Sequence, residues 1–162
     1  MANETRARKN GLKALDSVQK TLTKVGWEPQ ISETEGVFIV DFSVDNIPVS
    51  DAVADLRIDY ERFVFYLNIK GHASAKTQIE TIEFVTRANY DLIIGNFEFN
   101  FKDDSVRFKS SIDFTEETLS EALIRNVIKC AMDVVEQYGD ELVHVMKGVK
   151  KAAQAISDAE SA

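Results

Sequence analysis

The chain has 162 residues and a formal net charge of -8 at pH 7, and 44% of its residues are hydrophobic. This length fits one domain with a sizeable core, and the composition is too apolar for a disordered chain. The acidic balance argues against a nucleic-acid partner, because Lys and Arg contacts to phosphate supply most non-specific affinity for a polyanion.

The cysteine content and the hydropathy indicate a cellular location. The single cysteine, Cys130, excludes an intrachain disulfide and suits a reducing compartment. No apolar run reaches the ~18 residues that a membrane span needs, and the first residues lack the apolar core of a signal peptide. We therefore expect a cytoplasmic protein with no membrane span.

The first elements in chain order are a helix and a short strand. Apolar residues recur at helical spacing from Leu12 to Val25, and Gly26 should end this helix. Pro29 would break a helix and Gly36 allows a hairpin turn, so the intervening residues predict a turn and a short first strand.

Three further strands follow. Residues 37–45 alternate as a second strand, with Phe42 and Val44 on its inner face. After the predicted turn "NIPVSD", alternation over residues 55–60 predicts a third, half-buried strand. The tight connection "YERF" leads to a fourth strand over residues 63–69.

A second helix is expected from about residue 74 to 94. Thr77 and Glu80 stand at the spacing of a capping box at its start. Gly95 should be its C-cap, with a left-handed backbone. The apolar side of this helix is expected to carry Ile79, Ile82, Val85 and Leu92.

The remaining residues predict a hairpin and a long helix. The alternation after Gly95 is that of a hairpin turning at "DDS", residues 103–105. The last helix should begin at a polar cap, either Asp113 or Thr115, and Gly139 is the candidate site of a kink in it. We expect one domain over residues 1–148 and a polar, frayed tail over residues 149–162.

The order of elements, α-ββββ-α-ββ-α, predicts an α+β fold in which helices flank an antiparallel sheet. The segment "RANYDLIIGNFEFNFKDDSVRFKSSIDF", followed by a long amphipathic helix ending "VHVMKG", resembles the YbjN family. The resemblance covers about residues 10–148, although relatives often have a glycine in the hairpin turn where this chain has "DDS". It is most specific around Asn89, Gly95, Phe97, Glu98, Val106, Arg107 and Gly148.

The resemblance implies a fold like that of type III secretion chaperones. The family is labelled a bacterial sensory transduction regulator, and this label names no reaction. It therefore provides no catalytic residues to transfer to this chain.

One segment, "FVFYLNIKGHASAKTQ", imitates a phosphate-binding loop. A strand and a glycine precede Lys76 and Thr77 at the start of a helix, but three residues, not four, separate Gly71 from Ala75, which stands where a second glycine is required. An ordinary helix start explains the segment better than nucleotide binding does.

Metal binding has little support. A zinc site needs three or four ligands, and the chain offers only His72, His144 and Cys130, which lack the usual ligand spacing. The pair Asp103-Asp104 lacks the spaced acidic pattern of a calcium loop, so a polar turn explains it better. We expect neither a metal nor a cofactor.

Catalytic residues are not expected either. Cys130 lies on the apolar stripe of the last helix, where a small core residue is the simpler interpretation. Ser110 and Ser111 lie in a strand without a Gly-x-Ser-x-Gly elbow. Trp27 is interpreted as packing in the core more readily than as an anchor for a partner.

The reverse face of the sheet is the candidate binding site. An exposed apolar strip in a charged frame usually marks a protein contact, whereas the alternative is that the C-terminal helix folds over it. The sequence leaves both possibilities open. The predicted protein-binding residues are Val37, Ile39, Val64 and Tyr66, framed by Asp41, Arg57, Asp59, Glu98, Arg107 and Lys109.

The function that these patterns favour is a non-enzymatic protein-binding module, chaperone-like or regulatory, that forms a homodimer and binds a protein of unknown identity. The alternative is a sensor domain that holds a small molecule between helix and sheet. The enzyme class is disfavoured because no nucleophile, base and orienting group can be placed together.

Overall fold

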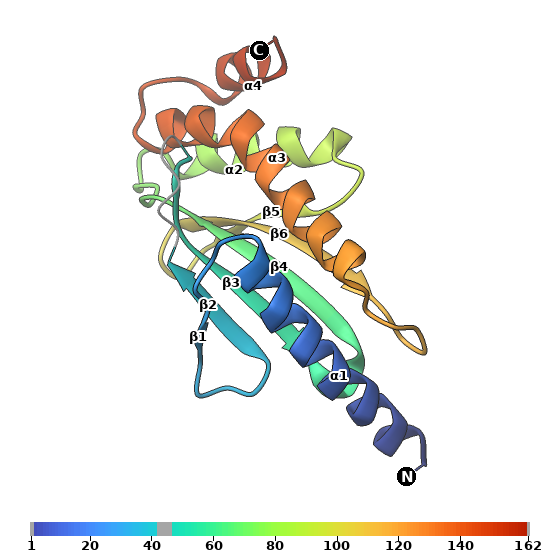
Figure 1. Cartoon of the computed structure of the whole chain (residues 1–162). Helices are drawn as coiled ribbons and strands as arrows, with labels where there is room; N and C mark the ends of the chain where they lie inside the picture. The colour runs from blue at the N-terminus through green and yellow to red at the C-terminus, as the bar shows by residue number, and fades with distance from the viewer. Residues whose placement is uncertain (1, 42–46, 162) are drawn as a thin grey trace.

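The computed structural model describes residues 2–41 and 47–161. A six-stranded antiparallel sheet forms one layer, three helices form a second layer on it, and the C-terminal helix packs on the helical layer (Figure 1). The observed order of elements confirms the expected α-ββββ-α-ββ-α arrangement and adds a fourth helix at the C-terminal end.

The sheet has the strand order β1-β2-β3-β4-β6-β5, and each neighbouring pair is antiparallel. Gly36 lies in the turn that joins the first two strands, as expected. The strands are β1 (Gln30–Ile31), β2 (Val37–Asp41), β3 (Val49–Arg57), β4 (Arg62–Ile69), β5 (Asn96–Asn100) and β6 (Ser105–Asp113).

The helices cover one face of this sheet, which we call the inner face. Helix α1 lies on β3, α3 lies on β4 and β6, α2 lies beside β5, and α4 packs on α2 and α3. Within the described ranges, no helix has the length and apolar composition needed to cross a bilayer. The helices are α1 (Ala2–Lys24), α2 (Gln78–Asp91), α3 (Glu121–Met146) and α4 (Ala152–Ser161).

The centre of the core is the inner face of β4, where large residues alternate with small neighbours across the sheet. Phe65 is fully buried between Ala54 of β3 and Ser110 of β6, and Trp27 stacks on its ring with 5.8 Å between ring centroids. Burying one such aromatic side chain contributes about 1.5–3 kcal/mol. Trp27 is partly buried and packs against the core, in agreement with the packing role expected for it.

The third strand differs from the prediction. It lies over Val49–Arg57, and the chain then forms a short 3-10 helix, η1 (Ile58–Tyr60), which buries Ile58 but leaves Tyr60 69% exposed. The inner-face residues of β3 include alanines, which give the period-two pattern little hydrophobic contrast. Phe42 and Val44 lie outside the described residues.

Helix α2 is shorter than predicted and rotated relative to the expectation. Its buried residues include Phe84 and Ala88, whereas Ile79 is 72% exposed. The predicted capping box is wrong, because the Thr77 hydroxyl donates to the carbonyl of Met146 at 2.9 Å and makes no cap bond to α2. Thr77 instead connects the start of α2 to the end of α3.

The last long helix also begins later than predicted. Ser120 is its N-cap, while Asp113 accepts hydrogen bonds from the hydroxyl and backbone N–H of Thr115 in the preceding turn. These bonds lower the pKa of Asp113 to about 2. The helix continues through Gly139, as expected, to Met146. A Cβ at Gly139 would lie 2.7 Å from a ring carbon of Pro48, so glycine permits close packing there.

A buried carboxylate attaches α1 to the corner of the sheet. Glu61 is 2% exposed and accepts hydrogen bonds from Arg6 at 2.6 and 3.2 Å and from Asn10 at 2.7 Å. Although burial raises the pKa of Glu61, the bonds from Asn10 and Arg6 outweigh it and hold the pKa below its usual value. The group therefore stays ionised and connects two distant segments.

Glu61→Gln should lower the free energy of unfolding at neutral pH by about 1–3 kcal/mol, because the charge-assisted bonds weaken. The pKa of Glu61 is lower in the folded protein than its value of about 4.3 in the unfolded chain, so the ionised carboxylate stabilises the fold above that pH. This stabilisation is lost as the pH falls through the folded-state pKa of Glu61. Urea denaturation at a series of pH values should show the difference between wild type and variant shrinking below about pH 4. A difference that persists unchanged in acid would contradict this account.

Gly95 does not cap α2, which ends at Asp91, but it has the expected positive φ of +79° at the start of β5. A Cβ there would lie 2.5 Å from the Phe108 ring and 2.7 Å from the Lys109 carbonyl oxygen. Gly95→Val should therefore destabilise the protein by about 2–5 kcal/mol, through backbone strain and overpacking.

The matched control is Gly71→Val. Gly71 has a φ of +88° but open space around its missing Cβ, so only the strain of about 1–2 kcal/mol should appear. Thermal or urea unfolding of both variants separates the two effects. Equal losses at the two positions would show that the contact with Phe108 is unimportant.

Candidate functional site

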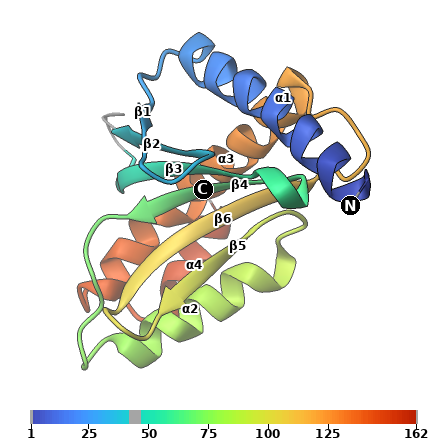
Figure 2. The same cartoon turned by 90° about the horizontal axis from the view of Figure 1, so that it is seen from below.

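The candidate site is the outer face of the sheet, opposite the helices. In Figure 2, β4, β6 and β5 pass in front of α3 and α4, with this face toward the viewer. The strand register aligns its side chains in two rows across the sheet. One row is Val37, Asp55, Val64 and Ser111, and the next is Ile39, Val53, Tyr66 and Lys109.

Apolar side chains make up most of the centre of these rows, and Asp55 is the exception. Ile39 is 39% exposed and the other apolar residues are half-buried, whereas inner-face residues such as Phe65 are fully buried. Helix α3 packs on the inner face, where the Tyr138 ring contacts the Phe97 ring edge to face, with 6.4 Å between the ring centroids. Helix α3 therefore does not cover the outer face. The outer-face strip, as we call it, consists of Val37, Ile39, Val53, Val64 and Tyr66.

Paired charges border the strip along β6. The guanidinium carbon of Arg107 lies 4.1 Å from the centre of the Tyr66 ring, and Arg107 also forms an ion pair with Glu98 at 2.7 Å. Lys109 forms a second ion pair with Glu98. Burial raises the pKa of Glu98, but hydrogen bonds from Lys109 and Arg107 outweigh it and keep the pKa low.

One acidic group on β3 interrupts the strip. Asp55 is 7% exposed and lies between Val37 and Val64, where Arg57 pairs with it at 2.7 Å. Asp59 belongs to η1 and pairs instead with a residue of α1, so it is not part of this frame. The side chain of Asp41 is outside the described set.

The structure places all four predicted residues on one face, and it adds Val53. The prediction missed Val53 because it began the third strand only at Asp55. The signal was present, since extending the alternation backwards from the buried Leu56 assigns Val53 to the outer face. That a protein partner binds to this strip remains a prediction.

The edge of the sheet beside this face is partly blocked. The Asn89 side chain on α2 accepts from the Phe97 N–H at 2.7 Å and donates to the Phe97 carbonyl at 3.0 Å. These two backbone groups point away from β6 at the β5 edge, where another strand would otherwise pair. Asn89 thus provides the bonds of a neighbouring strand.

Asn89→Ala should cost about 1–3 kcal/mol in free energy of unfolding, because it leaves the N–H of the buried Phe97 unpaired and leaves the Phe97 carbonyl with only the longer bond from Asn96. Asn96→Ala is the control, since it removes only one donor to the same carbonyl, at 3.2 Å. Urea denaturation compares them. A loss no larger than that of the control would contradict the edge-blocking role of Asn89.

The other candidate residues form no common site. His72 Nδ1 lies 2.9 Å from the Asp103 carbonyl oxygen, whereas His144 lies 3.6 Å from Glu141. Across the described ranges, no group of three His, Cys, Asp or Glu side chains is arranged to hold a metal. Cys130 is half-buried, with Sγ 3.5 Å from the Ile94 carbonyl oxygen, so it lies at the edge of the core.

The serines and the loop that resembles a phosphate-binding loop also have structural explanations. The Ser110 hydroxyl is buried on the inner face and has no hydrogen-bond partner among the described residues, and Ser111 is exposed on the outer face. The segment after Gly71 bonds to the β5–β6 hairpin through the Ala73 N–H and the Asp104 carbonyl at 2.9 Å. It therefore serves as a connection between β4 and α2.

Comparison with known protein families identifies one match to this chain. A family model described as "YbjN: Putative bacterial sensory transduction regulator" matches residues 14–144. No curated protein matches the sequence. The matched range includes the whole sheet and α2.

Three solved structures have a similar fold at low sequence identity. The crystal structure of YbjN from E. coli has a TM-score of 0.62 and 11% identity, over 75% of this chain and 85% of that chain. The ExsC–ExsE complex has a TM-score of 0.51 and 14% identity, over 80% and 93%. The HopA1–SchA chaperone–effector complex has a TM-score of 0.55 and 12% identity, over 82% and 96%. These likenesses confirm the expected fold.

Proposed function

Because the chain belongs to the YbjN family and presents an apolar strip on the outer face of its sheet, we propose that it is a non-enzymatic protein-binding module. Its role in this proposal is chaperone-like or regulatory. The observation that carries the proposal is the outer-face strip, which remains accessible although the helices bury the inner face almost completely.

The energetics of the strip suit a binding surface. Removing roughly 100–200 Å² of apolar area from water contributes about 2–5 kcal/mol before the costs of association. That is enough to influence affinity without being needed for folding. The ion pairs of Arg57 and Arg107 along the borders would orient a partner and disfavour wrong ones.

The structural neighbours support a protein as the ligand. Two of them are complexes of two proteins, and one is named a chaperone–effector complex. Their identities to this chain, 14% and 12%, are too low to transfer a particular partner. The partner is therefore proposed only as a class, a protein, for a chain that we propose to be cytoplasmic.

A second copy of the chain is one such partner. The segment "VFIV" of β2 buries Phe38 and Val40 on the inner face and presents Val37 and Ile39 on the outer face. A self-complementary patch of this kind suits a two-fold dimer. We propose that the protein forms a homodimer through the outer-face strip.

The alternative of a small-molecule sensor has less support. A ligand site of that kind is a closed, mostly apolar pocket. The groove of about 770 Å³ beside the strip is open and mainly polar, lined by Asn68, Glu98, Phe99, Asn100, Lys102, Ser105 and Arg107.

The variant Ile39→Asp/Val64→Asp tests the protein-binding proposal. It places two charges on the strip at partly exposed positions, so the fold should persist while dimerisation and partner capture are lost. Light scattering across micromolar concentrations measures the dimer, and affinity capture with mass spectrometry measures retained proteins. Ile79→Asp, at an isoleucine 72% exposed on α2, is the matched control and should behave as wild type.

The outcomes are distinct. A wild-type mass that stays near 18.2 kDa at every concentration removes the homodimer. Partners lost with Ile79→Asp but kept by the double variant would place binding on α2. Loss of far-UV circular dichroism in the double variant would show that the strip supports folding.

A further inference from the structure

The C-terminal helix α4 occupies residues for which the sequence suggested a frayed tail. Its contact with α2 and α3 is made of small side chains, and Ile156 is the one larger apolar residue among those buried. Small residues allow close approach but remove little apolar area from water. The buried residues of α4 are Ala152, Ala155, Ile156 and Ala159.

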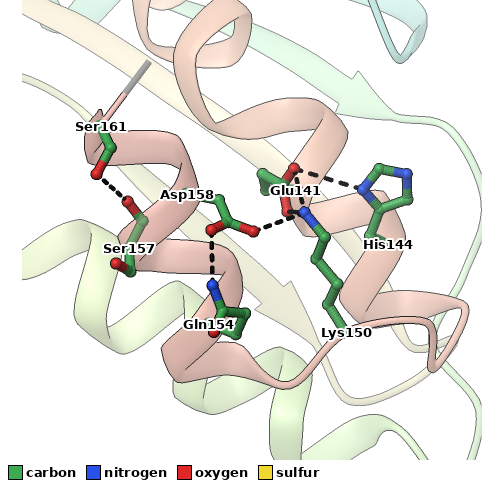
Figure 3. A network of polar contacts seen from close by, with 7 residues as sticks. All are labelled: Glu141, His144, Lys150, Gln154, Ser157, Asp158 and Ser161. Carbon is green, nitrogen blue, oxygen red and sulfur yellow. Dashed lines mark hydrogen bonds and ion pairs between the residues drawn. The ribbon is translucent and has the colours of Figure 1, made fainter.

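An ion-pair network adds to this attachment, beside a hydrogen bond from Gln137 of α3 to the carbonyl of Ala159 at 3.4 Å. Lys150 Nζ lies 2.7 and 2.8 Å from the Glu141 carboxylate of α3 and 2.7 Å from Asp158 of α4 (Figure 3). Gln154 donates to the other oxygen of Asp158 at 2.7 Å, and His144 lies 3.6 Å from Glu141. Lys150 thus links α4 to α3 by charge.

A second carboxylate holds the start of α4. Glu80 of α2 accepts a hydrogen bond from the backbone N–H of Ala152 at 2.9 Å and one from Lys151 at 2.8 Å. A carboxylate at a helix N-terminus is favoured by the helix dipole. Because Lys151 is exposed and Lys150 and Asp158 are only partly buried, dissolved salt should weaken these contacts.

The range matched by the family model excludes α4 but includes most of the two helices on which α4 packs. Residues 14–144 match the family model and include α2 and almost all of α3, whereas α4 lies beyond them. A helix of ten residues is also too short to be stable alone in water. It therefore depends on the α2–α3 surface for its structure.

We propose that the surface of α2 and α3 on which α4 packs is a docking site for a short amphipathic helix, and that α4 is a reversible occupant of it. Helix α4 detaches as a unit while the sheet, α1 and α3 stay folded. A competing helix would carry small or aliphatic residues at the spacing of Ala152, Ala155, Ile156 and Ala159, with a carboxylate at the position of Asp158.

Hydrogen exchange with mass spectrometry on the full chain tests the detachment. Amides of residues 152–161 should exchange faster than those of α3, and faster still as sodium chloride is added. Lys150→Gln should raise their exchange roughly tenfold and leave the sheet unchanged. Lys129→Gln, which removes the exposed Lys129–Asp133 pair of α3, is the control and should leave α4 unaffected.

Two results would overturn the detachment. One is exchange of α4 at the same rate as α3 in every condition, which would mean that both open only with global unfolding. The other is equal behaviour of Lys150→Gln and Lys129→Gln.

A labelled peptide of residues 149–162 tests whether the α2–α3 surface is a docking site. Fluorescence anisotropy should show binding to full-length Ala155→Glu/Ala159→Glu, whose own α4 cannot dock, and at least tenfold weaker binding to wild type. Emission of Trp27, which stacks on Phe65 far along the chain from α4, checks that the core is intact. If that emission changes, Lys150→Glu replaces the double variant. An intact variant that binds no peptide shows that the surface is not a helix-docking site.

Discussion

The structure depends on one constraint: an antiparallel sheet has two faces, and this chain uses its helices to cover only one. Alternation along each strand sends large apolar side chains such as Phe63 and Phe65 to the inner face, where α1 and α3 exclude water. The outer face must then be compatible with solvent on its own. It combines short apolar residues with carboxylates and guanidinium groups that neutralise one another.

The same constraint explains how the polar groups are arranged. Arg107 is held by Glu98 and by the Tyr66 ring, so the cation, the anion and the aromatic face are satisfied within the monomer. On the inner side, the buried Glu61 carboxylate is satisfied by Arg6 and Asn10. In both places ion pairs reinforce elements that are already held by packing, as by the buried Val18 and Leu22 of α1 and the Phe97–Phe108 contact of the hairpin.

How much the sequence predicted depended on side-chain size. Strand β4 and the β5–β6 hairpin were predicted because residues such as Phe65 and Phe97 give alternation a strong contrast. Strand β3 was shifted because Ala52 and Ala54 are small, and this shift hid Val53 from the candidate site. Alanine and threonine residues had the same effect in two helices. They hid which side of α2 is buried, and they hid that α4 is a helix at all, since tertiary contacts and not the local pattern decide where such residues are buried.

The edges of the sheet have a consequence for how it meets other chains. Strand β1 is only two residues long, and Asn89 engages the outward backbone groups of Phe97 in β5. Templated growth, in which one chain adds strands to another as in a cross-β fibril, is therefore obstructed at both ends. An extended polypeptide would instead lie across the sheet, and its apolar spacing, more than its main chain, would determine whether it is retained.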